Sequence, residues 1–208
     1  TPANRLPHHA MARTKDRLTH EQINNQNTNK MTRIEYIVRY GPHVVESLKG
    51  TQLFPSVMIA QAILESTDKK GVPGGSLLAS KYNNHFGIKA GKAWRGEKVL
   101  LLTKEFVNGA MKSVLDWFRV YQSAFESFDD RIHFLLNNLR YIKGGVFEAK
   151  DFAAQAQALQ RSGYATDPVY ASKLTNLIRK LKLDTIDELG VPGINLLSLA
   201  SEDRPKPS

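Results

Sequence analysis

Residues 56–66 read SVMIAQAILES, an almost wholly apolar stretch that ends near a carboxylate, Glu65. Pro55 precedes the stretch, and proline suits the first position of a helix because its fixed φ is already helical. Apolar residues fall on every side of the helix that this stretch would form, so we expect the helix to be central and buried. The fold should therefore be built around a helix whose last turn carries an acid.

The segment before this central helix is also predicted to be helical. Thr32 and Glu35 have the spacing of a capping box and predict a helix that starts at Thr32. Gly41-Pro42 is expected to break that helix, and a short helix should follow as far as Leu48. The stretch TDKKGVPGGS, directly after the central helix, reads as a loop.

The middle of the chain changes character over residues 94–121. Two extended runs flank Asn108-Gly109, a dipeptide that strongly favours a β-hairpin turn. Beyond the hairpin, helices are expected from Ser127, over about 151–160, and from Asp167-Pro168. The pattern predicts an α+β fold, a mostly helical body with a small β-hairpin lobe of about residues 94–121.

Three segments are expected along the 208 residues: a polar N-terminal arm (1–30), one domain (31–189) and a C-terminal extension (190–208). The formal net charge of +9 suits an anionic partner such as nucleic acid, a membrane surface or an acidic wall polymer, and equally suits plain solubility. No apolar run is long enough to span a bilayer. Cysteine is absent, which excludes disulfides, and the six histidines have no metal-ligand spacing.

Glu65 has two interpretations from the sequence alone. Burial and the negative end of the helix dipole would both raise its pKa, as a general acid at neutral pH requires. Alternatively, Glu65 is a solvated residue at a helix end that happens to reach the surface.

Five stretches in order extend the argument: FPSVMIAQAILES, YNNHFGIKA, WRGEKVLLLTKEF, FRVYQSAFES and SGYATDPVYASKL. Together they resemble the peptidoglycan N-acetylglucosaminidases of glycoside hydrolase family 73, the flagellar-muramidase and autolysin type. The resemblance implies a lysozyme-like fold with a substrate groove beside the hairpin lobe, and it implies that Glu65 is the catalytic acid. The loop after Glu65 departs from the Gly-Trp-Gly-like continuation that is frequent in the family.

A second acid is expected on the hairpin, because glycosidases usually flank the scissile bond with two carboxylates. Glu105 in LLTKEF matches the hairpin acid of the family, and Glu97 is the alternative with the same strand parity. Either could instead be an ordinary exposed strand residue.

Four residues are candidates for binding the sugar. Tyr164 matches a tyrosine of the family's site, although it could also be a loop aromatic packed on the body. Asn84 could bond an acetamido group and Phe86 could stack on a sugar, but their segment could equally be a turn between lobes. Trp94, at the entrance of the lobe, could stack on a sugar or act as packing at a hinge.

The resemblance implies hydrolysis of the β-1,4 bond between N-acetylglucosamine and N-acetylmuramic acid. The expected partner is the glycan strand of peptidoglycan, not nucleic acid, and neither a cofactor nor a metal is expected. The substrate implies a location in the periplasm or the cell envelope, although the chain opens on Thr1 without a signal peptide. Alternatives are a muramidase, a lytic transglycosylase, or a non-catalytic wall-binding module.

Overall fold

The structure of the protein, a computed structural model, describes residues 30–107 and 110–189, apart from the side chains of residues 105–107 and 189. The expected polar arm, except Lys30, and the expected C-terminal extension therefore lie outside the described residues. The elements follow in the order α2 (Arg33–Ser47), α3 (Pro55–Ser66), α4 (Leu77–Tyr82), β1 (Lys98–Val107), β2 (Ala110–Arg119), α5 (Ala124–Leu136), α6 (Leu139–Lys143), α7 (Phe152–Arg161), α8 (Tyr170–Lys180) and α9 (Asp184–Leu189).

Helix α3 is the central helix that its sequence predicted. Helices α2, α7, α8 and α9 all pack on it, and its side chains from Ser56 to Ile63 are buried. The residue before the helix, Phe54, gives no side-chain cap, but the carboxylate of Asp187 in α9 replaces one. Asp187 accepts from the backbone N–H of Ser56 at 2.8 Å and from its hydroxyl at 2.6 Å. The helix that carries Glu65 is thus held firmly at its start.

Helix α2 begins as predicted and then differs from the prediction. Thr32 and Glu35 form the expected capping box. The helix does not break at Gly41-Pro42, however, but runs through Pro42 to Ser47. Proline removes one backbone hydrogen bond, whereas the continuous helix keeps Tyr40 and Val44 in the core. Burial of this apolar face outweighs the lost bond.

Helix α5 also starts earlier than predicted, and it carries much of the site. Its N-cap is Ser123, which accepts from the backbone N–H of Glu126 at 3.3 Å, and the helix runs from Ala124. Ser127, the predicted start, is buried inside the first turn and donates to the carbonyl of Ala124 at 2.8 Å. Both serines suit a helix start, so the sequence alone could not separate them.

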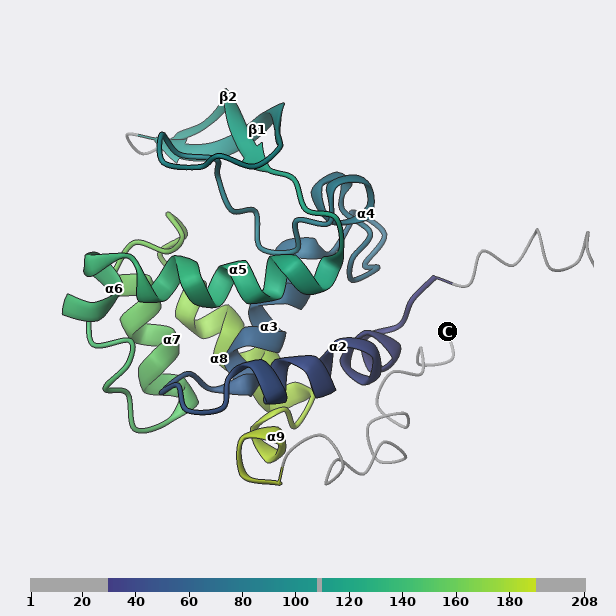
Figure 1. Ribbon diagram of the computed structural model, residues 1–208. Helices are drawn as coiled ribbons and strands as arrows, with labels where there is room; N and C mark the ends of the chain where they lie inside the picture. Colours follow the sequence, from purple (N-terminus) through teal and green to yellow (C-terminus); the bar gives the residue numbers. More distant parts are fainter. Residues whose placement is uncertain (1–29, 108–109, 190–208) are drawn as a thin grey trace, which may run out of the picture. The chain divides into compact units, whose positions relative to one another are not determined.

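The hairpin of β1 and β2 confirms the prediction made from Asn108-Gly109. Its antiparallel register runs from Lys98 opposite Arg119 to Val107 opposite Ala110. Figure 1 shows the hairpin projecting from the helices beyond α5. One of its faces is apolar but exposed, with the opposed pairs Leu100–Trp117 and Leu102–Leu115. The α+β class, a helical body with a small hairpin lobe, is confirmed.

Within residues 30–107 and 110–189, no helix is both long enough and apolar enough to cross a bilayer.

Candidate active site

A cleft of about 1030 Å³ brings together the end of α3, the segment after α4, the base of the hairpin, α5 and the loop before α8. Four of the residues predicted from the sequence line it: Glu65, Phe86, Trp94 and Tyr164. They come from segments that lie far apart in the chain, from the end of α3 to the loop before α8. The fold therefore joins the motifs around one cavity.

Glu65 is half-buried at the floor of this cleft, one residue before α3 ends. Burial raises the pKa of its carboxyl to about 7, because a charged carboxylate loses solvation there. A hydrogen bond from Tyr170 and the charge of Lys173 lower the pKa, while the charge of Asp167 raises it, and burial wins. A pKa of about 7 keeps a large protonated fraction at neutral pH, as a general acid requires.

Beneath Glu65 lies a chain of buried polar side chains that joins α5, α3 and α8. Arg131 of α5 donates from Nη2 to Oε1 of Gln61 in α3. Nε2 of Gln61 in turn donates to the hydroxyl of Tyr170 in α8 at 2.8 Å. Because Tyr170 also contacts Glu65, the chain connects a buried arginine with the acid.

Tyr164 completes the floor. Its ring stacks on that of Tyr170 at 5.8 Å between centroids, and its hydroxyl lies near the charge of Arg131. Within the described part of the chain, this buried hydroxyl has no hydrogen-bond partner of standard geometry. Buried polar groups normally have partners; burial raises the pKa of this hydroxyl and the neighbouring Arg131 guanidinium lowers it, so Arg131 is the polar group that acts on it. We name Glu65, Gln61, Arg131, Tyr164 and Tyr170 the floor of the cleft.

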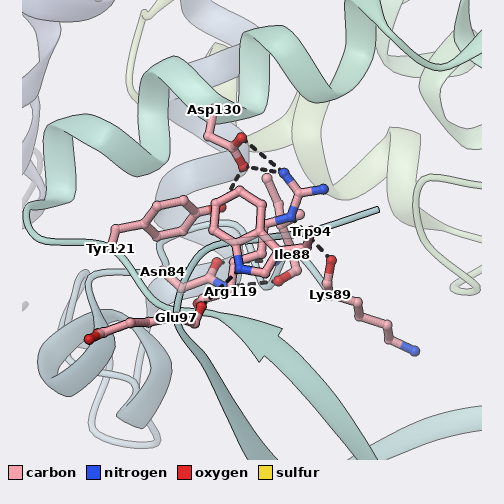
Figure 2. A network of polar contacts seen from close by, with 8 residues as sticks. All are labelled: Asn84, Ile88, Lys89, Trp94, Glu97, Arg119, Tyr121 and Asp130. Carbon is pink, nitrogen blue, oxygen red and sulfur yellow. Dashed lines mark hydrogen bonds and ion pairs between the residues drawn. The ribbon is translucent and has the colours of Figure 1, made fainter. Parts of the chain in front are cut away.

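A second polar network joins the base of the hairpin to α5 (Figure 2). The Arg119 guanidinium donates to both carboxylate oxygens of Asp130, at 2.9 and 2.6 Å, and Tyr121 donates its hydroxyl to Asp130 at 2.6 Å. The Trp94 ring lies against the Arg119 guanidinium, 4.4 Å from ring centroid to Cζ. We name Trp94, Arg119, Tyr121 and Asp130 the hinge.

Trp94 thus has the hinge position that the sequence left open beside sugar stacking. Its indole N–H is used, because it donates to the carbonyl of Glu97 at 2.9 Å. The side chain still lines the cleft and keeps part of its surface exposed.

Asn84 and Phe86 have structural uses that differ from the expected sugar contacts. The Asn84 amide donates to the carbonyls of Ile88 and Arg119, at 3.0 and 2.9 Å, and accepts from the Ile88 N–H at 3.0 Å. Its polar atoms are therefore already engaged in fixing the turn beside the hairpin. Phe86 is 3% exposed and packs edge-on against Phe128, so only its rim borders the cleft.

The two candidates for the second acid differ in what the structure describes. Glu97 is exposed and does not line the cleft, and Figure 2 shows its side chain directed away from the Arg119–Asp130 pair. Glu105 lies opposite Lys112 in the hairpin, and its side chain lies outside the described residues. Thr103, two positions before Glu105, lines the cleft.

The sequence interpretation missed the buried polar members of both networks. Gln61 is the lone amide within the apolar run of α3, which could have marked it as a buried hydrogen-bonding residue. Arg131 falls between Phe128 and Ile132, two buried residues of α5, so its position on the inner face could have been predicted. Tyr170 shares helical spacing with the buried Leu174 and Ile178 of α8, so its position predicts a core residue and gives no sign of its polar contact.

Metal binding finds no donor set in the part of the chain that the structure describes. No group of three or more His, Asp or Glu side chains there could hold an ion.

The chain is similar to known proteins over most of the described residues. A family model described as "Glucosaminidase: Mannosyl-glycoprotein endo-beta-N-acetylglucosaminidase" matches residues 41–183. The exo-glucosaminidase LytG of Bacillus subtilis is 41% identical over 140 residues, which cover 66% of this chain and 47% of LytG. The peptidoglycan hydrolase FlgJ of Escherichia coli K12 is 40% identical over 133 residues, 61% of this chain and 39% of FlgJ.

The catalytic domain of the autolysin Auto from Listeria monocytogenes has the same fold, with a TM-score of 0.61 at 31% identity. The match covers 82% of this chain and 98% of that domain. The chain spans less than half the length of LytG and of FlgJ. The matched residues 41–183 include every side chain of the floor and the hinge, and the chain belongs to the glucosaminidase family.

Proposed function

We propose that the protein hydrolyses the β-1,4 bond between N-acetylglucosamine and N-acetylmuramic acid in peptidoglycan. One observation carries the proposal: Glu65 faces an open cleft with a pKa raised to about 7 by burial. The name of FlgJ, a peptidoglycan hydrolase, supports the choice of polymer, and the name of LytG, an exo-glucosaminidase, supports the choice of sugar.

In this mechanism Glu65 protonates the oxygen that leaves the sugar. Proton delivery by a positioned acid contributes a factor of about 10²–10⁴ to the rate of such reactions. Tyr164, whose hydroxyl has no partner in the described chain, orients the acetamido group or a water. Trp94 offers the exposed part of its ring to a sugar face at the hairpin side of the cleft.

Glu105 is proposed as the second acid, which activates water or stabilises the positive charge that develops on the sugar. The position of Thr103 in the cleft favours Glu105, whereas Glu97 lies away from the cleft. Glu105→Gln should lower turnover strongly with little loss of wall binding, and Glu97→Gln is the matched control. If Glu97→Gln were the crippled variant, the roles would be exchanged; if both variants kept full turnover, a single-acid reaction would replace this mechanism.

The ends of the products identify the bond that is cut. Purified sacculi are digested, the new reducing ends are reduced with borohydride, and the muropeptides are analysed by mass spectrometry. Reduced N-acetylglucosamine supports the proposal. Reduced N-acetylmuramic acid would show a muramidase, which one relative's name, "Probable N-acetylmuramidase" of Lactococcus lactis, makes a specific alternative. Anhydro ends would show a lytic transglycosylase.

LytG is named an exo-enzyme, whereas the matching family model is described as endo, so both terminal and internal cleavage are specific alternatives. The lengths of the products in the same digest distinguish them. Long oligosaccharides early in the reaction support an endo-enzyme. Sacculi that bind the protein but release nothing would show a non-catalytic wall-binding module. Because the proposed substrate lies outside the cytoplasmic membrane, we place the protein in the periplasm or the cell envelope.

A further inference from the structure

Arg131 is a fully buried cation with no carboxylate partner among the residues that the structure describes. Its side chain is 0% exposed, and its one hydrogen bond of standard geometry within the described residues runs from Nη2 to the amide oxygen of Gln61, while the Tyr164 hydroxyl also acts on its charge. Nε and Nη1 have no partner in the described part of the chain. A buried charge without a counter-ion destabilises a protein, so the residue is poorly explained by a contribution to stability.

The chemistry of arginine fixes the direction of the whole chain of bonds. A guanidinium carries donors only, so the Gln61 amide must turn its oxygen toward Arg131. The amide nitrogen then faces Tyr170 and donates to its hydroxyl oxygen at 2.8 Å. Tyr170 is an acceptor in this bond, and its one hydroxyl hydrogen is free to be donated to another group.

Glu65 is the group to which this hydrogen can be donated, because Tyr170 lies within interaction range of its carboxyl. The charged and titratable side chains that act on Glu65 are Tyr170 and Lys173 of α8, Asp167 before α8, and Tyr164. Lys173 and Asp167 form an ion pair with each other, which offsets their opposite effects. Of these, Tyr170 is the side chain that the chain of bonds from Arg131 reaches, and its interaction with the carboxyl lowers the pKa of Glu65 against the larger, raising effect of burial.

We propose that Arg131 is a positioning residue that acts through Gln61 to direct the Tyr170 O–H toward Glu65. A hydrogen bond in this direction stabilises the carboxylate that Glu65 becomes when it gives up its proton. The proposal rests on the proposed role of Glu65 as the acid. It assigns to Gln61 and Tyr170 a function that their burial alone would not give them.

The test is a double-mutant cycle of Tyr170→Phe and Gln61→Glu, read from the pH profile of the initial rate on sacculi. Tyr170→Phe removes the hydrogen bond that favours the Glu65 carboxylate. The alkaline limb of the pH–rate profile, which reports the pKa of Glu65, should therefore shift to higher pH by about one unit. In Gln61→Glu, the new carboxylate keeps the bond to Arg131 but presents an acceptor to Tyr170. The O–H then turns away from Glu65, and the limb should move by a similar amount.

The cycle separates this effect from the added charge. If Gln61→Glu acts through Tyr170, it should no longer move the limb when Phe is already at position 170. An unmoved limb in both single variants, or a Gln61→Glu shift of equal size in both backgrounds, would overturn the proposal. Circular dichroism of each variant verifies that the protein is folded.

A second pair of variants leaves Gln61 in place and serves if Gln61→Glu does not fold. Arg131→Lys keeps a donor for the Gln61 oxygen and should keep the wild-type limb. Arg131→Met has no donor, so the amide can turn its oxygen to Tyr170, and the limb should move to higher pH. Identical limbs in the two variants would contradict the positioning role.

One measurement keeps this inference independent of the proposed function. The Glu65 carboxyl can be titrated by ¹³C NMR in the labelled full chain, with Glu65→Gln to assign its signal. Tyr170→Phe and Gln61→Glu should each raise the titration midpoint, and Arg131→Lys should not. An enzyme that fails to cut sacculi but shows these shifts would overturn the function alone. Cutting without the shifts would overturn the inference alone.

Discussion

The floor and the hinge of the cleft each contain a buried or half-buried arginine, but the hydrogen-bonding partners of the two guanidinium groups differ. Arg119 in the hinge meets the Asp130 carboxylate through two hydrogen bonds, and Tyr121 supplies a third to the same carboxylate. Arg131 in the floor meets a neutral amide, and two of its nitrogens have no partner among the described residues. One network is saturated, whereas the other has unused polar groups and an acid with a raised pKa.

This difference between the two networks indicates that the hinge contributes to stability and the floor to function. A saturated network of matched charges holds two elements together. Unsatisfied groups and a desolvated acid destabilise the folded state, and such groups gather where a protein performs chemistry. We therefore expect floor variants to lose activity without losing stability, and hinge variants to lose stability.

The largest expected effect is on the floor. Glu65→Gln keeps the shape of the side chain but removes the proton that is transferred, so the rate on sacculi should fall by about 10³ or more. Circular dichroism and sedimentation with purified walls should show a folded protein that still binds. Turnover near that of the wild type would exclude Glu65 as the acid.

Removal of the carboxylate from the hinge should have the largest effect on stability. Asp130→Ala leaves Arg119, whose side chain is 16% exposed, without its partner. The free energy of unfolding should fall by roughly 2–3 kcal/mol, measured by urea denaturation. The control is Asp129→Ala, because Asp129 pairs with His43 at a more exposed place, 47% for the Asp129 side chain. An equal loss in both variants would contradict the special role of the hinge.

The stability of Glu65→Gln should depend on pH in a defined direction. The folded-state pKa of Glu65 is about 7, above its ordinary value of 4.5, so the folded protein binds the proton more tightly than the unfolded chain does. The destabilising contribution of Glu65 is therefore complete above about pH 7 and absent below about pH 4.5. Glu65→Gln should be more stable than wild type by about 2 kcal/mol at alkaline pH. Thermal melts should show that the difference vanishes in acid; a variant less stable than wild type at both extremes would refute the sign.

The smallest expected effect comes from comparing two tyrosine hydroxyls. Tyr164→Phe removes a hydroxyl without a partner in the described chain, so stability should stay unchanged or rise, while turnover should fall about tenfold. Tyr121→Phe removes a hydroxyl that donates to Asp130 at 2.6 Å, so stability should fall. Urea midpoints and rates on sacculi for the pair provide the test. An unchanged rate in Tyr164→Phe would leave Tyr164 with a packing role only.

Much of this arrangement was predictable because its signals are local. The apolar run before Glu65 predicted the central helix, and Asn108-Gly109 predicted the hairpin, since both depend on neighbouring residues. The Pro42 prediction was wrong because burial of Tyr40 and Val44 is a tertiary effect that the local rule omits.

The polar networks could not be predicted in the same way. Arg131, Gln61 and Tyr170 lie far apart in the chain, and each looks ordinary in its own helix. Their direction of hydrogen bonding follows only when α5, α3 and α8 are placed side by side. The hydrogen bonds of Asn84 with Ile88 could not be predicted either, because they depend on how the turn folds.

Both tryptophans of the chain belong to the hairpin side of the molecule: Trp94 in the hinge and Trp117 on the exposed face of β2. Neither lies in the helical core. Fluorescence excited at the red edge of the aromatic band, where tyrosine no longer absorbs, is therefore an intrinsic reporter of the lobe alone. Emission from Trp94 can follow a glycan entering the cleft, and a lobe that melts before the helices would be seen as a fluorescence transition ahead of the loss of helical ellipticity.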